Sequence, residues 1–258
     1  MATHNEFVFI CHLIFAGGLL LAAGRLGRIW LVAVIVVCTL LMNIVVMKQE
    51  TLFGLPVTGG NVLYATVFLA NDVINEHFGK RAARAAVLTG FATGLAVVIL
   101  MQIELWYAPN ESDVAEPHLR YFFDAQAYPR IVVVSMISYL LSQLLDTQLY
   151  QLIRQRTGAN RLLWLRSNAS TWISQAFDTV FFTTAALADL RLLFPDVPSW
   201  LGSQAVLHCW SDLGSAILFA YLIKIFVAVI DTPFLYLTTW RPLIPPGSWR
   251  ETGSPVPP

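Results

Sequence analysis

Long apolar stretches, separated by short polar connections, follow one another along most of this chain. A helix needs about 20 mainly apolar residues to cross the hydrocarbon core of a bilayer. We expect seven spans, at Phe7–Gly24, Ile29–Met47, Gly60–Lys80, Ala85–Trp106, Arg130–Ile153, Asn168–Asp189 and from about His208 to Trp240. The pattern therefore predicts an all-α polytopic membrane protein, a bundle of six to seven transmembrane helices.

The connections between the spans are expected to be loops. A loop with Pro56 is expected at Lys48–Gly60, an acidic loop at Tyr107–Pro129, a basic loop at Arg154–Ser167 and another loop at Leu190–Ser203. We divide the chain into residues 1–28 as an extra N-terminal transmembrane helix, 29–240 as the helix bundle and 241–258 as a disordered cytoplasmic tail rich in proline.

Composition excludes an ordinary soluble protein. The 258 residues are 57% hydrophobic and 12% charged, about half the charge of a soluble domain. The formal net charge is zero, so charge gives no sign of a nucleic-acid partner. Cys11, Cys38 and Cys209 are dispersed and suggest neither a disulfide framework nor a metal site.

Basic residues fall in alternate connections, which sets the expected orientation. The richer set has eleven members and the other connections hold four, Lys48, Arg120, Arg130 and Arg191. The eleven are Arg25, Arg28, Lys80, Arg81, Arg84, Arg154, Arg156, Arg161, Arg166, Arg241 and Arg250. We expect this set to face the cytoplasm, with the N-terminus outside and the C-terminus inside.

The third span carries carboxylates where a membrane helix usually carries none. Asp72, Asn75 and Glu76 share one face at helical spacing, and Gly79 is expected to end the helix. A carboxylate at this depth is costly unless it faces protein or water. We interpret Glu76 as an interfacial side chain that extends toward Lys80. Asp72 is too short to do this and is expected to face the interior of the bundle.

The later spans carry stripes of polar residues at helical spacing. The fifth has Ser135, Ser138, Ser142 and Asp146, the sixth Asn168, Thr171, Gln175 and Asp178, and the last Lys224 and Asp231. Several polar faces cannot all meet lipid, so they should converge. Isolated Ser and Thr residues fit ordinary contacts between helices. We expect Lys224 to pair with Asp178 or Asp231, and the charged residues together to mark a site.

Motifs for catalysis and for energy supply are missing from the sequence. It contains no His-Glu-x-x-His, no Gly-x-Ser-x-Gly and no phosphate-binding glycine loop. We therefore predict no enzyme activity, no metal and no cofactor. An intramembrane enzyme that uses the carboxylates for acid–base chemistry is the weakest alternative.

Four stretches of the chain match signatures of a known family, in order. They are residues 68–84 (FLANDVINEHFGKRAAR), 128–146 with YPRI and QLLD, 163–179 (LWLRSNASTWISQAFDT) and 231–236 (DTPFLY). From about Asn43 to Tyr236 the chain resembles the queuosine precursor transporters, the vitamin uptake transporter family. It departs from the family in having Ala65 where a proline is expected before Thr66, and in its extra first span.

The resemblance implies an importer of 7-deazaguanine precursors of the tRNA base queuosine, in the cytoplasmic (inner) membrane of a bacterium. The fold implied is similar to the substrate-binding components of modular vitamin importers. The partners implied are a purine-like small molecule and the lipid bilayer, with no nucleic acid; energising subunits or a homo-oligomer stay open. A substrate-capture subunit for another vitamin is the alternative function. The site candidates from the motifs and the polar stripes are Asp72, Asn75, Glu76, Arg130, Asp146, Asn168, Ser170, Thr171, Gln175, Asp178 and Lys224.

A guanine-like edge presents a ring N–H beside an amino group, and one ionised carboxylate can accept from both. We expect Asp178 to be this carboxylate, with Asp72 as the second candidate. Gln175 lies on nearly the same face as Asp178 and could bind the carbonyl edge of the ligand. Tyr139 or Phe181 could stack on the base.

Overall fold

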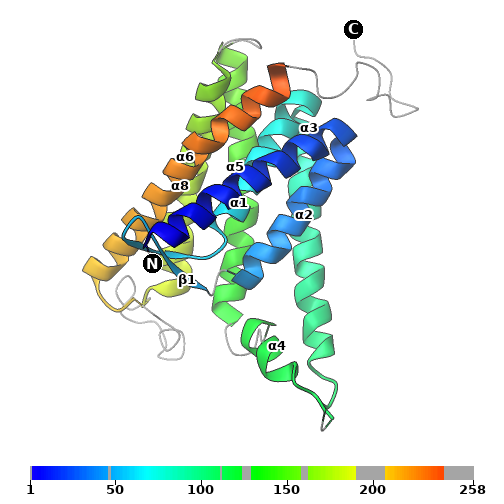
Figure 1. The fold of residues 1–258 in the computed structure, drawn as a ribbon, viewed down its shortest axis with the longest axis vertical. Helices are drawn as coiled ribbons and strands as arrows, with labels where there is room; N and C mark the ends of the chain where they lie inside the picture. Colours follow the sequence, from blue (N-terminus) through cyan, green and yellow to red (C-terminus); the bar gives the residue numbers. More distant parts are fainter. Residues whose placement is uncertain are drawn as a thin grey trace.

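The computed structural model describes residues 2–45, 48–110, 112–123, 129–157, 162–189 and 207–240. It is a bundle of long helices with one small hairpin (Figure 1). The elements are α1 (Ala2–Leu26), α2 (Arg28–Val45), β1 (Gln49–Leu52), β2 (Leu55–Thr58), α3 (Asn61–Glu104), α4 (Glu116–Phe123), α5 (Pro129–Thr157), α6 (Leu163–Phe182), η1 (Thr183–Leu187) and α8 (Trp210–Trp240). The expected all-α polytopic architecture is confirmed.

Five of the described helices are long and apolar enough to cross a membrane, namely α1, α2, α3, α5 and α8. The 44 residues of α3 extend about 66 Å at 1.5 Å per residue, which is twice the thickness of a hydrocarbon core. Its two halves meet at Gly79, whose φ of 82° and ψ of 174° are not helical. Gly79 therefore breaks the helix where the third predicted span was expected to end, and the fourth predicted span belongs to the second half of α3.

The hairpin of β1 and β2 occupies the connection that we predicted to be a loop. Phe53 and Gly54 form its two-residue turn, with φ values of 52° and 79°. Contacts with other elements stabilise the left-handed backbone conformation of Phe53. Its N–H donates to Glu6 (3.0 Å), and its ring packs edge-on against Phe9 and Phe226. The sequence pattern did not reveal these strands, because each has only four residues and β2 contains Pro56.

Helix α1 belongs to the packed bundle and runs obliquely between α2 and α8, across α3 (Figure 1). Its first half shares a core with the hairpin, α3 and α8 through Phe9, Leu13 and Ala16. Its second half reaches the core of α2 and α3 through Leu20 and Ala23. The division of the chain into three parts stays a prediction, and the tail at 241–258 lies outside the described residues.

One predicted loop has different bounds in the structure, and another contains a short helix. The basic connection is shorter than expected, because α5 continues to Thr157 and α6 starts at Leu163. We assigned Arg166 to the loop because arginines are usually exposed, but its side chain is only 2% exposed and lies in the packed helix α6. The acidic connection contains α4, where Arg120 pairs with Glu116 and donates to the carbonyl of Leu105 (3.1 Å). The loop predicted at Leu190–Ser203 lies outside the described residues.

We predict that Gly79→Ala destabilises the fold through the backbone alone. A Cβ on Gly79 would meet nothing within 4 Å, so steric crowding is not the cause. Its φ and ψ lie in a region that essentially only glycine adopts, and the cost for alanine is about 1–3 kcal/mol. Thermal unfolding of the purified protein in detergent measures the change. Gly18→Ala is the control, since Gly18 is helical and its Cβ would also be free; equal melting temperatures for the two variants would contradict the prediction.

Candidate functional site

Helix α6 carries the densest set of buried polar side chains in the described chain. It packs against α5 and α8, and its polar face is buried. The buried polar members are Arg166, Ser167, Asn168, Ser170, Thr171, Ser174, Gln175, Asp178 and Thr179. A helix of this composition is tolerated at membrane depth only when other helices cover its polar face. The convergence of polar stripes that we expected is therefore confirmed.

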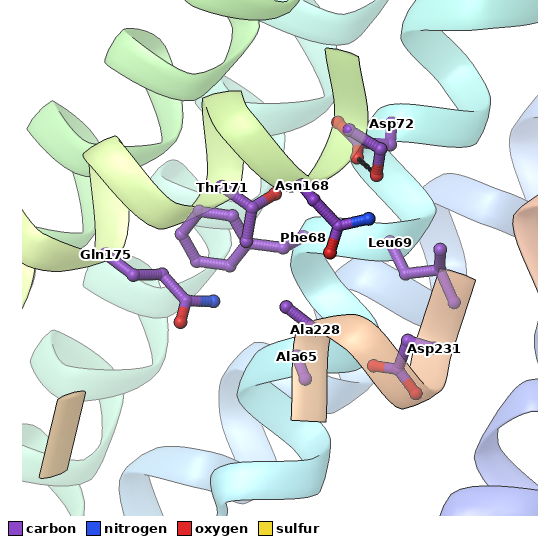
Figure 2. A pocket seen from close by; sticks show the side chains of 10 residues that line it. Ala65, Phe68, Leu69, Asp72, Asn168, Thr171, Gln175, Ala228 and Asp231 are labelled. Atoms are coloured by element: carbon purple, nitrogen blue, oxygen red, sulfur yellow. Dashed lines mark hydrogen bonds between the residues drawn. The ribbon is translucent and has the colours of Figure 1, made fainter. Parts of the chain in front are cut away.

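A small pocket lies between α3, α6 and α8 (Figure 2). Its lining residues are Ala65, Phe68, Leu69, Asp72, Ser167, Asn168, Thr171, Gln175, Ala228 and Asp231. Its cavity volume is about 10 Å³, which is room for roughly one water molecule. Binding sites for small molecules usually measure about 300–1,000 Å³. In this conformation the pocket is therefore too small for a base.

Several acceptors of the pocket have no donor. The Oδ1 atoms of Asp72 and Asn168 and the Oε1 atom of Gln175 are buried without a hydrogen bond from any described residue. The amide of Asn168 is fixed in orientation, because its Nδ2 donates to Trp164 (2.9 Å) and to Thr232 of α8 (2.7 Å). Buried polar atoms almost always have partners, so three unfilled acceptors around one pocket need an explanation.

Asp72 and Asp146 meet behind this pocket. Asp72 Oδ2 accepts a hydrogen bond from Ser167 (2.5 Å), while Asp146 Oδ1 accepts from Thr171 (3.3 Å) and Ser174 (3.2 Å). The two carboxyl groups are within hydrogen-bonding reach of each other. Ser170 lies nearby and donates to the carbonyl of Ser167 (3.1 Å).

Glu76 does not extend toward Lys80, and that interpretation was wrong. It accepts from Arg166 (2.6 Å) and from the hydroxyl of Tyr150 (2.7 Å), with Arg154 at 3.7 Å. Its side chain is 10% exposed, because three helices close around the pair. Arg166, which we counted among the cytoplasmic basic residues, is thus the buried counter-ion of a carboxylate 90 positions away along the chain.

Asn75 links α3 to α5. Its Nδ2 donates to the carbonyl of Thr147 (3.2 Å), and its Oδ1 accepts from Gln151 (2.6 Å). On the preceding turn, Asn71 donates to the hydroxyl of Thr147 (2.9 Å). Both the NH2 group and the oxygen of the Asn75 amide therefore have partners at the contact between α3 and α5.

Lys224 pairs with Asp178, one of the two partners that we expected. The distance is 2.7 Å, and Nζ also donates to Thr179 (3.1 Å) and lies 4.7 Å from the ring centre of Tyr64. The second oxygen of Asp178 accepts from Ser138 (2.6 Å). Both oxygens of our first candidate for the ligand carboxylate thus have partners inside the protein, and Asp178 does not line the pocket.

Arg130 is placed away from the pocket, at the end of the π-helical turn η1. Its guanidinium donates to the carbonyls of Ala185 (2.7 Å) and Ala188 (2.5 Å). A cation is favourable beside the last carbonyls of a helix. In this structure Arg130 fixes the chain where α6 ends.

Two polar lining residues, Ser167 and Asp231, were absent from the expected set. Ser167 lies one turn before Thr171, so the spacing of the stripe on α6 contained the signal. Asp231 was considered only as a partner of Lys224; instead its buried carboxylate faces the pocket from α8. Figure 2 shows Asp231 and Asp72 at opposite margins of the pocket, with Asn168 between them.

Comparison with known proteins places this site in context. Residues 58–238 match a family model described as "Putative vitamin uptake transporter". The chain is 38% identical over 228 residues, 88% of each chain, to the "Probable queuosine precursor transporter" of Bacillus subtilis (strain 168). It is 25% identical over 177 residues, 69% of this chain and 76% of the relative, to the "Queuosine precursor transporter" of Escherichia coli (strain K12). No solved structure matches, so the likeness to substrate-binding components of modular importers stays a prediction.

We predict that Glu76→Gln destabilises the protein by about 3–5 kcal/mol, because it leaves Arg166 buried without a full counter-charge. Unfolding of the purified protein in detergent measures this loss. Glu116→Gln is the control: it breaks the Arg120 pair, where the arginine side chain is 47% exposed, and should cost about 0–1 kcal/mol. Similar losses in the two variants would contradict the prediction.

We predict that Lys224→Met lowers the yield of inserted protein, because Asp178 then keeps a buried charge without a cation. Adding Asp178→Asn removes that charge and should restore part of the yield. Lys48→Met, at a side chain that is 70% exposed, is the control and should leave the yield unchanged. Normal yield and full uptake in Lys224→Met would show that the pair contributes little.

Proposed function

This chain belongs to the vitamin uptake transporter family, and we propose that it imports queuosine precursors across the cytoplasmic membrane of a bacterium. The pocket between α3, α6 and α8 is the proposed substrate site. The observation that carries the proposal is its three buried acceptor oxygens without donors, on Asp72, Asn168 and Gln175. A ligand rich in N–H groups would supply the hydrogen-bond donors that these oxygens lack.

The 7-deazaguanine edge fits this requirement. It presents a ring N–H beside an exocyclic amino group, and an ionised carboxylate oxygen accepts from such donors more strongly than a neutral amide oxygen does. Asp178 has both oxygens filled by Ser138 and Lys224, whereas Asp72 keeps one oxygen free of donors. We therefore assign the carboxylate contact to Asp72 and contacts along the ring to Asn168 and Gln175.

The closed pocket supports a carrier that opens to load. Helix α8 supplies one wall through Ala228 and Asp231 and contains Pro233, which cannot donate to the carbonyl one turn earlier. Helix α6 ends in the π-helical turn η1. Both irregularities lie on the helices that form the wall, and movement of α8 away from α6 is the proposed opening.

The two ends of the bundle differ in charge, which supports the proposed orientation. The break of α3 lies beside the end of α8, since His77 contacts Thr238 (3.2 Å), and Arg154 reaches Asn75 there. This end gathers the basic connections, and we assign it to the cytoplasm. The hairpin and the start of α1 lie at the other end (Figure 1). The tail residues Arg241 and Arg250 lie outside the described chain.

Rescue of tRNA modification tests the function directly. In a bacterial host that can neither make nor import queuosine precursors, expression of this chain should restore queuosine in tRNA when a precursor is supplied. Absence of queuosine despite normal membrane insertion would overturn the proposal. Rescue only when energising subunits of a modular importer are co-expressed would instead identify a substrate-capture subunit.

We predict that Asp72→Asn reduces uptake about 5- to 150-fold at normal yield. Ser167 occupies Asp72 Oδ2, so the ligand meets Oδ1. An amide in its place loses the charge-assisted hydrogen bond or turns its NH2 group toward the ligand donors, and an unpaired buried donor costs about 1–3 kcal/mol. Uptake is measured per mole of membrane-inserted protein. Asp212→Asn, at an exposed carboxylate in the first turn of α8, is the control and should transport normally. A yield that falls together with uptake would mean that Asp72 mainly holds helices together, and normal uptake would exclude the carboxylate contact.

A further inference from the structure

Asp231 of α8 is a buried acid without a partner at the edge of the pocket. It is 6% exposed, and no described residue forms a hydrogen bond or an ion pair with it. It lines the pocket from the margin opposite Asp72 (Figure 2). A carboxylate in a dry interior is a costly charge unless a cation or a proton neutralises it. The neutralising group for Asp231 therefore comes from the solvent or from the ligand.

The contact between α6 and α8 sets the direction in which Asp231 faces. Thr232, the next residue of α8, accepts a hydrogen bond from Asn168 of α6 (2.7 Å). Ala228, three positions before Asp231 and on the same face of the helix, also lines the pocket. One face of α8, with Asp231 on it, is thereby turned toward the space between α3 and α6.

The pocket contains acids but no cation. The described residues that line it include two aspartates, Asp72 and Asp231, and no lysine, arginine or histidine. Lys224 lies seven positions before Asp231, about 10 Å along α8, and is paired with Asp178 at 2.7 Å. Arg166 of α6 is already the partner of a carboxylate on α3. A concave site lined by acids alone favours a positively charged ligand.

We propose that Asp231 binds a positively charged amine of the ligand, so that the preferred substrate is a 7-deazaguanine with an ammonium group on its five-membered ring. This inference rests on the proposed function, in which Asp72 binds the hydrogen-bonding edge of the six-membered ring. The opposite margin of the pocket, where Asp231 lies, then meets the five-membered ring (Figure 2). The ammonium group supplies the counter-charge that no described residue supplies.

The charge of the ligand changes its affinity strongly in such a place. Hydrogen bonds between charged groups are about twice as strong as neutral ones, and charges interact more strongly where water is excluded. The ammonium group also loses its own hydration when it binds, which opposes this gain. The contribution of Asp231 is therefore measured as the change in preference between a charged and a neutral ligand when the carboxylate is replaced.

Two ligands that differ in one group test the assignment. 7-Aminomethyl-7-deazaguanine is a cation at neutral pH, whereas 7-hydroxymethyl-7-deazaguanine is neutral and of nearly the same size. Titration calorimetry with the purified full chain in detergent measures both dissociation constants. The unmodified protein should bind the amine more tightly than the alcohol. Asp231→Asn should reduce the ratio of the two constants by about 10- to 150-fold, because an amide accepts from the amine without a charge.

Two control variants separate Asp231 from its surroundings. Asp212→Asn changes an exposed carboxylate on the same helix and should leave both constants unchanged. Asp72→Asn should weaken both ligands by a similar factor, since they share the edge that Asp72 binds, and so keep the ratio. Equal affinity for the two ligands or tighter binding of the alcohol in the unmodified protein would overturn the assignment, and so would a ratio that Asp231→Asn leaves unchanged.

Failure of the proposed function has a different signature. A folded, monodisperse protein that binds neither ligand would overturn the proposed substrate and, with it, the role of Asp231. Binding of both ligands with equal affinity would leave the proposed function intact and overturn the charge preference alone. The comparison of the two ligands on the unmodified protein decides this point even if Asp231→Asn fails to fold.

Discussion

A charge carried into a bundle of membrane helices has to be balanced inside it, and here the partners come from different helices. Glu76 of α3 is balanced by Arg166 of α6, and Lys224 of α8 by Asp178 of α6. The two partners on α6 are twelve positions apart, about 18 Å along the helix. A helix too polar to face lipid is thereby fixed to its neighbours at two levels, because separating either pair would leave a buried charge uncompensated.

Between these two levels the balance is incomplete, and the pocket lies there. Asn168, Thr171 and Gln175 line it from α6, with Asp72 and Asp231 from the flanking helices. Three oxygens without donors, on Asp72, Asn168 and Gln175, belong to this middle layer, whereas the carboxylates of the two ion pairs accept further hydrogen bonds from Tyr150 and Ser138. Asn71, Gln143, Asp146 and Trp172 carry further buried polar atoms without partners outside the pocket. A protein that carried polar groups here only to join helices would gain nothing from leaving them unfilled. The unfilled oxygens around the pocket are therefore the feature that supports the proposed binding site.

The sequence predicted features that depend on a local pattern of residues. It did not predict contacts between residues that lie far apart along the chain. Apolar runs and Gly79 located the spans, and the rarity of charge at membrane depth predicted an ion pair for Lys224. The spacing of polar residues placed the stripe of α6 on a buried face. Nothing local, however, separates Arg166 from the loop arginines around it, because its burial depends on Glu76. For the same reason the sequence favoured Asp178 over Asp72 as the ligand carboxylate, although Lys224 and Ser138 occupy both oxygens of Asp178 in the structure.

The contacts between α6 and α8 differ in strength along their length, which matters for a carrier. Toward the hairpin end the helices are joined by the charged pair of Lys224 and Asp178. Toward the other end they are joined by neutral bonds, from Asn168 to Thr232 and from the Trp164 N–H to the Tyr236 hydroxyl (3.2 Å). Hydrogen bonds between charged groups are roughly twice as strong as neutral ones. Under the proposed orientation the cytoplasmic end therefore parts more easily while the ion pair keeps the outer end closed. Alternating access requires that the interface between α6 and α8 open at only one end at a time.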